Sequence, residues 1–409
     1  MAAYNDFSFD WIDMVNRFIH DINLGDLAEE FNRKYAEKVE SMGRVNIIVA
    51  GRTGAGKSSL INAAFREKIA ETGMGDPVTS SIRKIEKVGV PVRIYDTVGL
   101  ELNQDKQKAS IAEIENLIRS NENKDVMDMI HLIWYCVFVE SERFESVEEN
   151  FLKEIANNNV PTVMVLTKAF DKELTDKFVL KLESKNLPVK KVFPVLSFDK
   201  LDYKAFGVDD LVEYSVSLLP EAVQSAWINA AKAIKLKREK SQKIVMGTVA
   251  TNFAVGFIPI PFADAAILAA AEIAMLGSIA ATYGFKLEKK ELVSFISALA
   301  GVGGATVLGK TIVSNLLKLV PGAGTVVGGA ISGTTAAILT FALGNAFIVE
   351  MDMIASGKIG KADINSNEVI KVIKKAFKEN LKIGKKKFRK GVPTAETMTN
   401  DDYVREGEV

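Results

Sequence analysis

The stretch from Val45 to Ser59 constrains the fold of this chain more than any other. A β-branched run, VNIIV, is followed by the pattern G-x-x-x-x-G-K-[ST] and then by a helix-forming run at residues 60–65. Glycines in such a loop let successive backbone N–H groups point inward around a phosphate, and the following helix adds its positive N-terminal end. The stretch therefore predicts a buried parallel strand, a phosphate-binding loop and a helix, in that order.

This loop supplies most of the expected ligand groups. The Lys57 ammonium would reach the β- and γ-phosphates of a nucleotide, and the Ser58 hydroxyl would ligate Mg²⁺. An ordinary glycine-rich turn is the alternative, but eight positions match in the right strand-loop-helix context. The residues expected to contact the nucleotide here are Gly51, Arg52, Thr53, Gly54, Ala55, Gly56, Lys57, Ser58 and Ser59.

Composition sets wider limits on the chain. Its 409 residues suggest two or three domains, and 52 basic residues balance 52 acidic ones, so no global field drives it onto nucleic acid or lipid. The single cysteine, Cys136, excludes an intramolecular disulfide and fits a reducing cytosol. The N-terminus lacks a secretory signal pattern. We therefore expect a cytoplasmic protein.

A second motif lies about forty residues after the loop. Strands are expected at residues 82–88 and 92–95, and the second runs directly into Asp96-Thr-Val-Gly99. A carboxylate at this place can hold Mg²⁺ through water, and the Gly99 N–H can approach a γ-phosphate. The tetrapeptide is a weak signal alone and a strong one immediately after an apolar strand.

Helices and strands then alternate. Strands are expected at residues 129–139, 162–166 and 191–196, and helices near residues 107–119 and 147–157. This alternation predicts a doubly wound, mostly parallel sheet that binds its ligand at the carboxyl ends of the strands.

A base-recognition element follows the strand at 162–166. The sequence Thr167-Lys168-Ala-Phe-Asp171 is similar to [NT]-K-x-D, in which the Asp carboxylate accepts two N–H bonds from guanine. Adenine would leave that carboxylate unpaired. Ser197, after the last strand, would offer a backbone N–H to the guanine carbonyl.

In this order the motifs resemble the five boxes of small GTPases. The Gly-x-Pro-Val-Thr form of the second box, at residues 75–79, resembles the Era and TrmE branch of bacterial GTPases, and the resemblance covers about residues 43–220. It implies GTP and GDP as ligands, Mg²⁺ as cofactor, and GTP hydrolysis. It also implies that Thr79 contacts Mg²⁺ and the γ-phosphate, and that Lys57, Thr79 and Gly99 serve catalysis, with Ser58, Thr79 and Asp96 at the metal.

Several residues depart from that family pattern. Asp171 comes one residue late and Phe170 takes its usual position, which leaves ATP open as a ligand. Leu100 stands where a water-orienting glutamine is usual. Gly54 replaces the asparagine of potassium-activated relatives, and Arg52 is interpreted as a surface or dimer-facing residue. Hydrolysis by the isolated chain should therefore be slow unless a second protomer of a homodimer, or a partner, completes the site.

The segments around this domain are predicted to be helical. Residues 1–42 read as amphipathic helices that pack on the next domain, and residues 221–356 as a hydrophobic helical domain. Charge is absent from residues 244–263, 293–309 and 322–349, and the first and last are long enough to span a bilayer. Their content of Gly, Ala, Ser and Thr also suits a soluble bundle, which is the alternative to the favoured membrane insertion or docking. The Pro-rich and Gly-rich junctions resemble a C-terminal domain of unknown function often appended to bacterial GTPases, which implies an all-helical, membrane-associated module.

A basic amphipathic helix is expected at residues 357–392. Twelve basic residues between positions 358 and 390 face only Asp363, Glu368 and Glu379. Such a helix suits an anionic lipid surface, and a solvated face on a bundle helix is an equal alternative. The lysines lack the aromatic interleaving or motif of nucleic-acid binders, which argues against nucleic acid as a partner. Residues 393–409 are expected to be disordered.

Together these features predict an α/β P-loop GTPase domain followed by an all-α hydrophobic domain. The favoured function is a GTP-binding and hydrolysing switch whose nucleotide state controls a module at the cytoplasmic face of the membrane. A soluble ribosome- or RNA-associated assembly GTPase is the alternative. A nucleotide-binding structural protein that barely hydrolyses GTP is a third hypothesis, suggested by Leu100.

Overall fold

The chain forms two compact units in this computed structural model. The structure describes residues 24–72, 74–79, 81–97, 104–141, 144–200, 202–255, 264–300, 333–360, 363–364 and 366–388. One unit comprises Val39–Leu236, and the other joins residues up to Lys38 with those from Lys237 onward. The expectations for residues 1–23, for Gly99 and Leu100, and for the tail at 393–409 lie outside the described residues.

A seven-stranded sheet organises the described part of the first unit, in the order β2-β3-β4-β1-β5-β6-β7. The five strands from β4 to β7 in that order run parallel, and β3 and β2 add an antiparallel edge. The predicted doubly wound, mostly parallel sheet is therefore confirmed. The strands are β1 (Val45–Gly51), β2 (Met74–Pro77), β3 (Ile82–Lys87), β4 (Val90–Thr97), β5 (Leu132–Phe138), β6 (Thr162–Thr167) and β7 (Val192–Val195).

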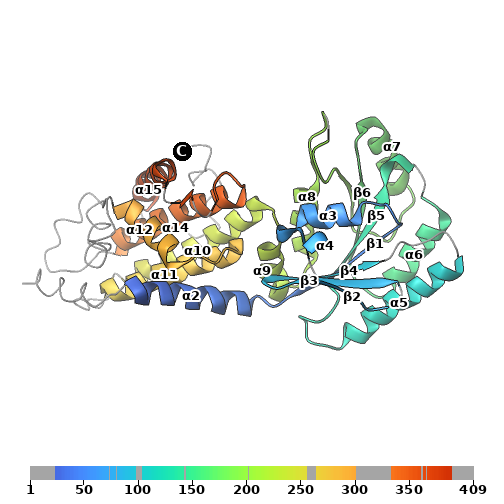
Figure 1. Cartoon of the computed structure of the whole chain (residues 1–409), viewed down its shortest axis with the longest axis horizontal. Coiled ribbons are helices and arrows are strands. Elements are labelled where there is room, and N and C mark those ends of the chain that lie inside the picture. Colours follow the sequence, from blue (N-terminus) through green and yellow to red (C-terminus); the bar gives the residue numbers. More distant parts are fainter. Residues whose placement is uncertain are drawn as a thin grey trace, which may run out of the picture. The chain divides into compact units, whose positions relative to one another are not determined.

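Helices cover both faces of this sheet (Figure 1). One layer contains α5 (Gln104–Glu122), α6 (Ser146–Ala156) and α7 (Lys172–Glu183). The other contains α3 (Lys57–Ala64), the short α4 (Ile69–Thr72), α8 (Val208–Leu218) and α9 (Glu221–Ala230). Because both faces are covered, the central strands β1 and β6 are buried at every position, which explains their unbroken apolar runs.

Two features of this unit depend on contacts between distant segments. The segment before Thr79, which is rich in turn-forming residues, forms strand β2 because it pairs with β3 along a sheet edge. The helical stretch that begins at Glu221 is broken at Ala231, where the Lys232 N–H donates to the Ala64 carbonyl at 2.9 Å. The helix before the break, α9, brings Trp227 against Phe65 and Trp134, so this unit ends at Leu236 and not at Pro220.

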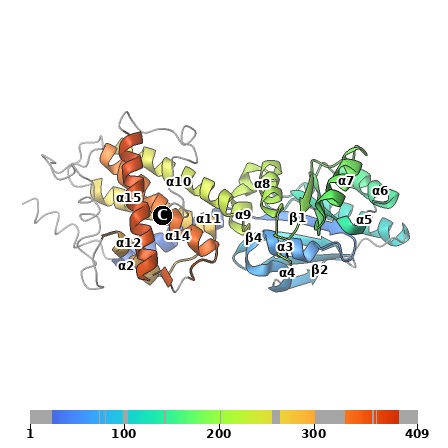
Figure 2. The same ribbon diagram turned by 90° about the horizontal axis from the view of Figure 1, so that it is seen from above.

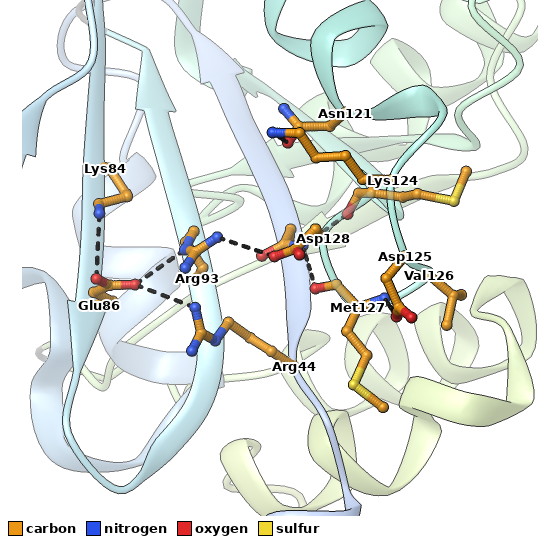
Figure 3. Close-up of polar contacts among 12 residues, drawn as sticks. Arg44, Lys84, Glu86, Arg93, Asn121, Lys124, Asp125, Val126, Met127 and Asp128 are labelled. Carbon is orange, nitrogen blue, oxygen red and sulfur yellow. Dashed lines mark hydrogen bonds and ion pairs between the residues drawn. The ribbon is translucent and has the colours of Figure 1, made fainter.

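Charged side chains join the strands and the loop before β5 at the amino end of β1. Figure 3 shows the Glu86 carboxylate between Lys84 at 3.3 Å, Arg93 at 3.0 Å and Arg44 at 3.8 Å, while Arg93 also lies 3.9 Å from Asp128. The opposite charges pair with one another here. We therefore interpret this cluster as a structural link. It lies at the end of the strands that is opposite the phosphate-binding loop.

The second unit is helical. Its described helices are α2 (Leu24–Ser41), α10 (Ile234–Val255), α11 (Asp264–Tyr283), α12 (Lys289–Ala300), α14 (Gly333–Ala355) and α15 (Asn367–Lys387). The unit boundary falls within two of them, since α2 belongs to this unit up to Lys38 and α10 belongs to it from Lys237. Their apolar side chains form one core, which includes Phe31 of the N-terminal helix α2. The expectation that the N-terminal helices pack on the domain that follows them in the chain is therefore wrong for α2, because periodicity shows an apolar face and not the surface that covers it.

Helix α14 is the most buried element of this unit. Its side chains are buried almost continuously from Gly333 to Met353, and a Cβ added at Gly344 would lie 2.5 Å from Val245. Among the described helices it alone is long and apolar enough to cross a membrane, and 94% of its most apolar 18-residue stretch is buried. A core helix of a bundle and a membrane span both fit this composition.

A buried polar contact links three helices of the same unit. The Asp352 carboxylate of α14 accepts hydrogen bonds from Tyr283 at 2.5 Å and from Arg238 at 2.7 Å. Because a buried carboxylate is costly without partners, this contact fixes how α10, α11 and α14 pack together.

Candidate nucleotide-binding site

The phosphate-binding loop joins the carboxyl end of β1 to α3. Gly51 has a φ of 142°, and a Cβ there would lie 2.3 Å from the Cys136 carbonyl of β5, so only glycine fits. Gly56, immediately before α3, has a φ of 80° in the left-handed region. These glycines allow the loop to curl over the N-terminus of α3, the geometry that binds phosphates. Thr53, Ser58 and Ser59 are exposed along it.

Lys57 folds back across this loop. Its side chain is buried, and its Nζ donates to the carbonyl oxygens of Gly51 at 3.0 Å and Arg52 at 3.1 Å. The ammonium is therefore held inside the loop, where the phosphates of a nucleotide are expected.

Asp96 lies beside the loop near the carboxyl end of β4, in register with Val49 of β1. Burial raises the pKa of its carboxyl group, and the positive charges of Lys57 and Arg83 partly offset that rise. Its Oδ1 is buried and has no hydrogen-bond partner in the described structure. An orphaned carboxylate oxygen at the end of β4 and an exposed Ser58 hydroxyl at the start of α3 suit a hydrated Mg²⁺ ion, because that cation prefers oxygen ligands and retains water.

Thr79 is held by another helix. Its hydroxyl donates to the Glu113 carboxylate of α5, which also accepts the Ser81 N–H at 3.1 Å. The Thr79 N–H donates to the Ile82 carbonyl at 3.2 Å, within the β2–β3 turn. Sequence analysis missed Glu113, because nothing in the local sequence of a helix shows which loop packs against it.

Thr167 joins the base-recognition segment to the phosphate-binding loop. Its hydroxyl donates to the Ala55 carbonyl at 2.6 Å and also lies 3.2 Å from the Val137 carbonyl. Lys168, at a positive φ of 55°, places its ammonium 4.3 Å from the centre of the Phe138 ring. The first two residues of the predicted motif therefore connect the ends of β5 and β6 to the phosphate-binding loop.

Asp171 has a second role as the N-cap of α7. Its Oδ1 accepts the Leu174 N–H at 2.9 Å, and the side chain is exposed. The ring of Phe170, one residue earlier, packs edge-on against the Tyr203 ring, with 5.6 Å between the ring centres. A phenyl ring cannot accept the hydrogen bonds that a carboxylate would accept from guanine. Ser197 follows β7 and is half-buried.

Arg52 is paired within its own chain. Its guanidinium lies 3.2 Å from Glu145 and 3.1 Å from the buried Glu148, at the start of α6. Burial raises the pKa of the Glu148 carboxyl, opposed by the Glu145 N–H and by Arg52, and the Tyr135 hydroxyl donates to it at 3.2 Å. The E-x-x-E pattern marks a helix start in the sequence, but it does not reveal that Arg52 reaches it.

Two separate parts of the chain match known families. Residues 46–168 match a 50S ribosome-binding GTPase family, and residues 226–381 match a domain of unknown function (DUF697). The predicted resemblance to Era- and TrmE-like GTPases, with a helical C-terminal domain of unknown function, is therefore confirmed.

Individual relatives cover only part of the chain. The tRNA modification GTPase MnmE of Treponema denticola is 27% identical over 60% of this chain and 49% of its own length. MnmE of Pasteurella multocida is 29% identical over 41% of this chain and 37% of its own. The chain thus spans half or less of the length of these curated relatives.

Solved structures are more distant. Era in complex with MgGDPNP and a segment of 16S ribosomal RNA is 16% identical, covers 48% of this chain and 67% of its own, and has a TM-score of 0.31. The G-domain of FeoB from Methanococcus jannaschii is 22% identical, and the match covers 45% of this chain and 99% of the FeoB chain, with a TM-score of 0.27.

Proposed function

Because this chain carries a GTPase domain joined to a helical domain of unknown function, we propose that it is a Mg²⁺-dependent GTP-binding and hydrolysing switch. Its nucleotide state would control the helical unit at the cytoplasmic face of a membrane. The observation that carries the proposal is the Lys57 ammonium held inside the loop, together with the Asp96 Oδ1, which has no hydrogen-bond partner among the residues described.

Each residue of the site would have its own role toward the phosphates or the metal. Backbone N–H groups of the loop would hold the phosphates, Lys57 would contact the β- and γ-phosphates, and Ser58, Asp96 and Thr79 would hold the metal. Bound Mg²⁺ would neutralise charge that develops on the phosphates. The Thr79 hydroxyl donates to Glu113, so its oxygen lone pairs stay available to a metal, and nucleotide binding would act on the β2–β3 turn and α5 together.

Membrane association is supported by the composition of the helical unit, above all by the length and hydropathy of α14. A soluble ribosome- or RNA-associated GTPase is the second candidate, favoured by the family that residues 46–168 match. Flotation of the protein with liposomes and its cosedimentation with ribosomes separate the two functions.

Hydrolysis by the isolated monomer is expected to be slow. A leucine such as Leu100 has no polar group that could orient water. In the described arrangement Arg52 is engaged by Glu145 and Glu148, so it does not activate the attack. A group from a second protomer or a partner would be needed, and an arginine supplied in this way contributes roughly 10³- to 10⁵-fold.

The test is GTP hydrolysis measured over a roughly hundredfold dilution of protein, with and without anionic vesicles. Activity per molecule should rise with protein concentration or with vesicles, which bring protomers together. A fast rate that stays constant per molecule would show that a group in the same chain completes the site.

Substitution of Asp171 by asparagine should change base preference without changing stability. Asparagine caps a helix as well as aspartate does, so the bond to the Leu174 N–H is retained. If the carboxylate reads guanine, GTP should bind more tightly than ATP to the wild type. Asp171→Asn should then weaken the binding of GTP and strengthen the binding of xanthosine triphosphate, because the extra carbonyl of that base meets an amide donor.

Calorimetric titration of the three nucleotides measures this change, with Asp176→Asn on the exposed face of α7 as the control. Equal affinity of the wild type for GTP and ATP, or no effect at Asp171, would show that the late aspartate serves only as a cap.

A further inference from the structure

Helix α15 has two faces of opposite character. Val369, Ile373, Phe377 and Leu381 are buried in the core of the helical unit, where α15 packs extensively on α14. Its apolar face is therefore already covered by protein. Of the two sequence-based interpretations, this agrees with a solvated charged face on a bundle helix, and not with a helix whose apolar face lies in a membrane interface.

The opposite face is a row of lysines. Between residues 367 and 387 eight lysines stand against two glutamates, in a chain whose total charge is zero. Lysines at steps of three or four residues fall on one side of a helix, and the exposed ones are Lys371, Lys375, Lys378, Lys382, Lys386 and Lys387. We call this set the lysine face. Figure 2 shows α15, in red, lengthwise across the helical unit.

The arrangement selects one mode of binding. An amphipathic helix that enters a membrane needs a free apolar face, and α15 has none. Lysine ammonium groups on flexible stems act as point charges without fixed geometry, which suits a fluid sheet of anionic headgroups. Helix α14, the described helix of membrane-spanning length, lies directly beneath α15 in the packing.

We propose that the lysine face adsorbs this protein onto anionic phospholipid by charge alone, without insertion of α15. The proposal deepens, and rests on, the membrane association in the proposed function. Each lysine near a charged membrane contributes roughly fivefold in affinity, so loss of four should weaken binding roughly 10²- to 10³-fold. Raised salt should release the wild type, because the Debye length falls to a few ångströms.

The test uses the full chain and vesicles of phosphatidylcholine, alone or mixed with phosphatidylglycerol. Variant one carries Lys371→Gln, Lys375→Gln, Lys378→Gln and Lys382→Gln. Its matched control loses the same charge from exposed lysines of the GTPase unit, through Lys172→Gln, Lys177→Gln, Lys181→Gln and Lys185→Gln. All of these side chains are exposed, so both variants should keep the wild-type unfolding temperature.

Wild type and control should bind the mixed vesicles and be released by salt, while variant one should stay in solution. Equal binding by variant one, or equal binding of the wild type to phosphatidylcholine alone, would overturn the proposal. The proposal would also be overturned if the wild type stays free of vesicles and binds RNA, and if variant one loses that RNA binding. The lysine face would then be a nucleic-acid surface. GTP affinity is measured on the same samples, so failure of the nucleotide switch is seen separately from failure of the lysine face.

Discussion

Replacement of Lys57 by alanine should abolish binding of Mg²⁺-nucleotide while the protein stays folded. The ammonium is buried inside the phosphate-binding loop and is held by the carbonyl oxygens of Gly51 and Arg52. A nucleotide would exchange those neutral partners for phosphate oxygens, a charge-assisted contact in a site that excludes most water. Loss of one partner from such a contact costs about 2–5 kcal/mol, or roughly 30- to 5,000-fold in affinity.

Isothermal calorimetry with GTP and GDP measures this loss. Lys172→Ala is the matched control, because Lys172 is an exposed lysine of the same unit at the start of α7. Thermal unfolding followed by tryptophan fluorescence checks the fold, since Trp134 and Trp227 lie in the core of this unit. Unchanged nucleotide affinity in Lys57→Ala would rule out the phosphate-binding role of the loop.

The parts of this unit that local sequence encodes were predictable. Strands β1 and β6 read as unbroken apolar runs because helices cover both faces of the sheet. The loop from Gly51 to Lys57 was predictable because its conformation demands particular residues at fixed spacing. Thr167 was predicted as part of a base motif, and its bond to the Ala55 carbonyl gives that position a physical reason.

What depends on packing between distant segments was not predictable. Helix α9 follows the apparent boundary at Pro220, yet Trp227 completes an aromatic cluster with Phe65 and Trp134. Helix α2 precedes the phosphate-binding loop in sequence but contributes Phe31 to the helical core. Periodicity shows that a helix has an apolar face, and it does not show which surface covers that face. The ion pairs of Arg52 were hidden for the same reason.

Glu350 of α14 makes the stability of the helical unit depend on pH. Its side chain is fully buried, and both carboxylate oxygens have no hydrogen-bond partner in the described structure. Burial, and to a lesser extent the nearby Glu291 carboxylate, raise its pKa from 4.5 to about 8. A carboxyl group in this position is therefore neutral in the folded protein at pH 7.

The sign of the effect follows from proton binding. Below pH 4.5 the carboxyl group is protonated in both the folded and the unfolded chain, and it adds no pH dependence. As the pH rises from 4.5 toward 8, the unfolded chain releases the proton while the folded chain keeps it, so the free energy of unfolding falls. The largest loss that this shift allows is roughly 5 kcal/mol, reached above the folded-state pKa.

Substitution of Glu350 by glutamine should remove most of this fall. Glutamine is neutral at every pH and nearly the same size, so urea unfolding followed by circular dichroism should show little change from the wild type at about pH 5 and a clear gain at about pH 9. Glu368→Gln, at an exposed position in the first turn of α15, is the control and should follow the wild type. If wild type and Glu350→Gln lose stability in parallel as the pH rises, other groups set the pH dependence and the buried carboxyl group does not.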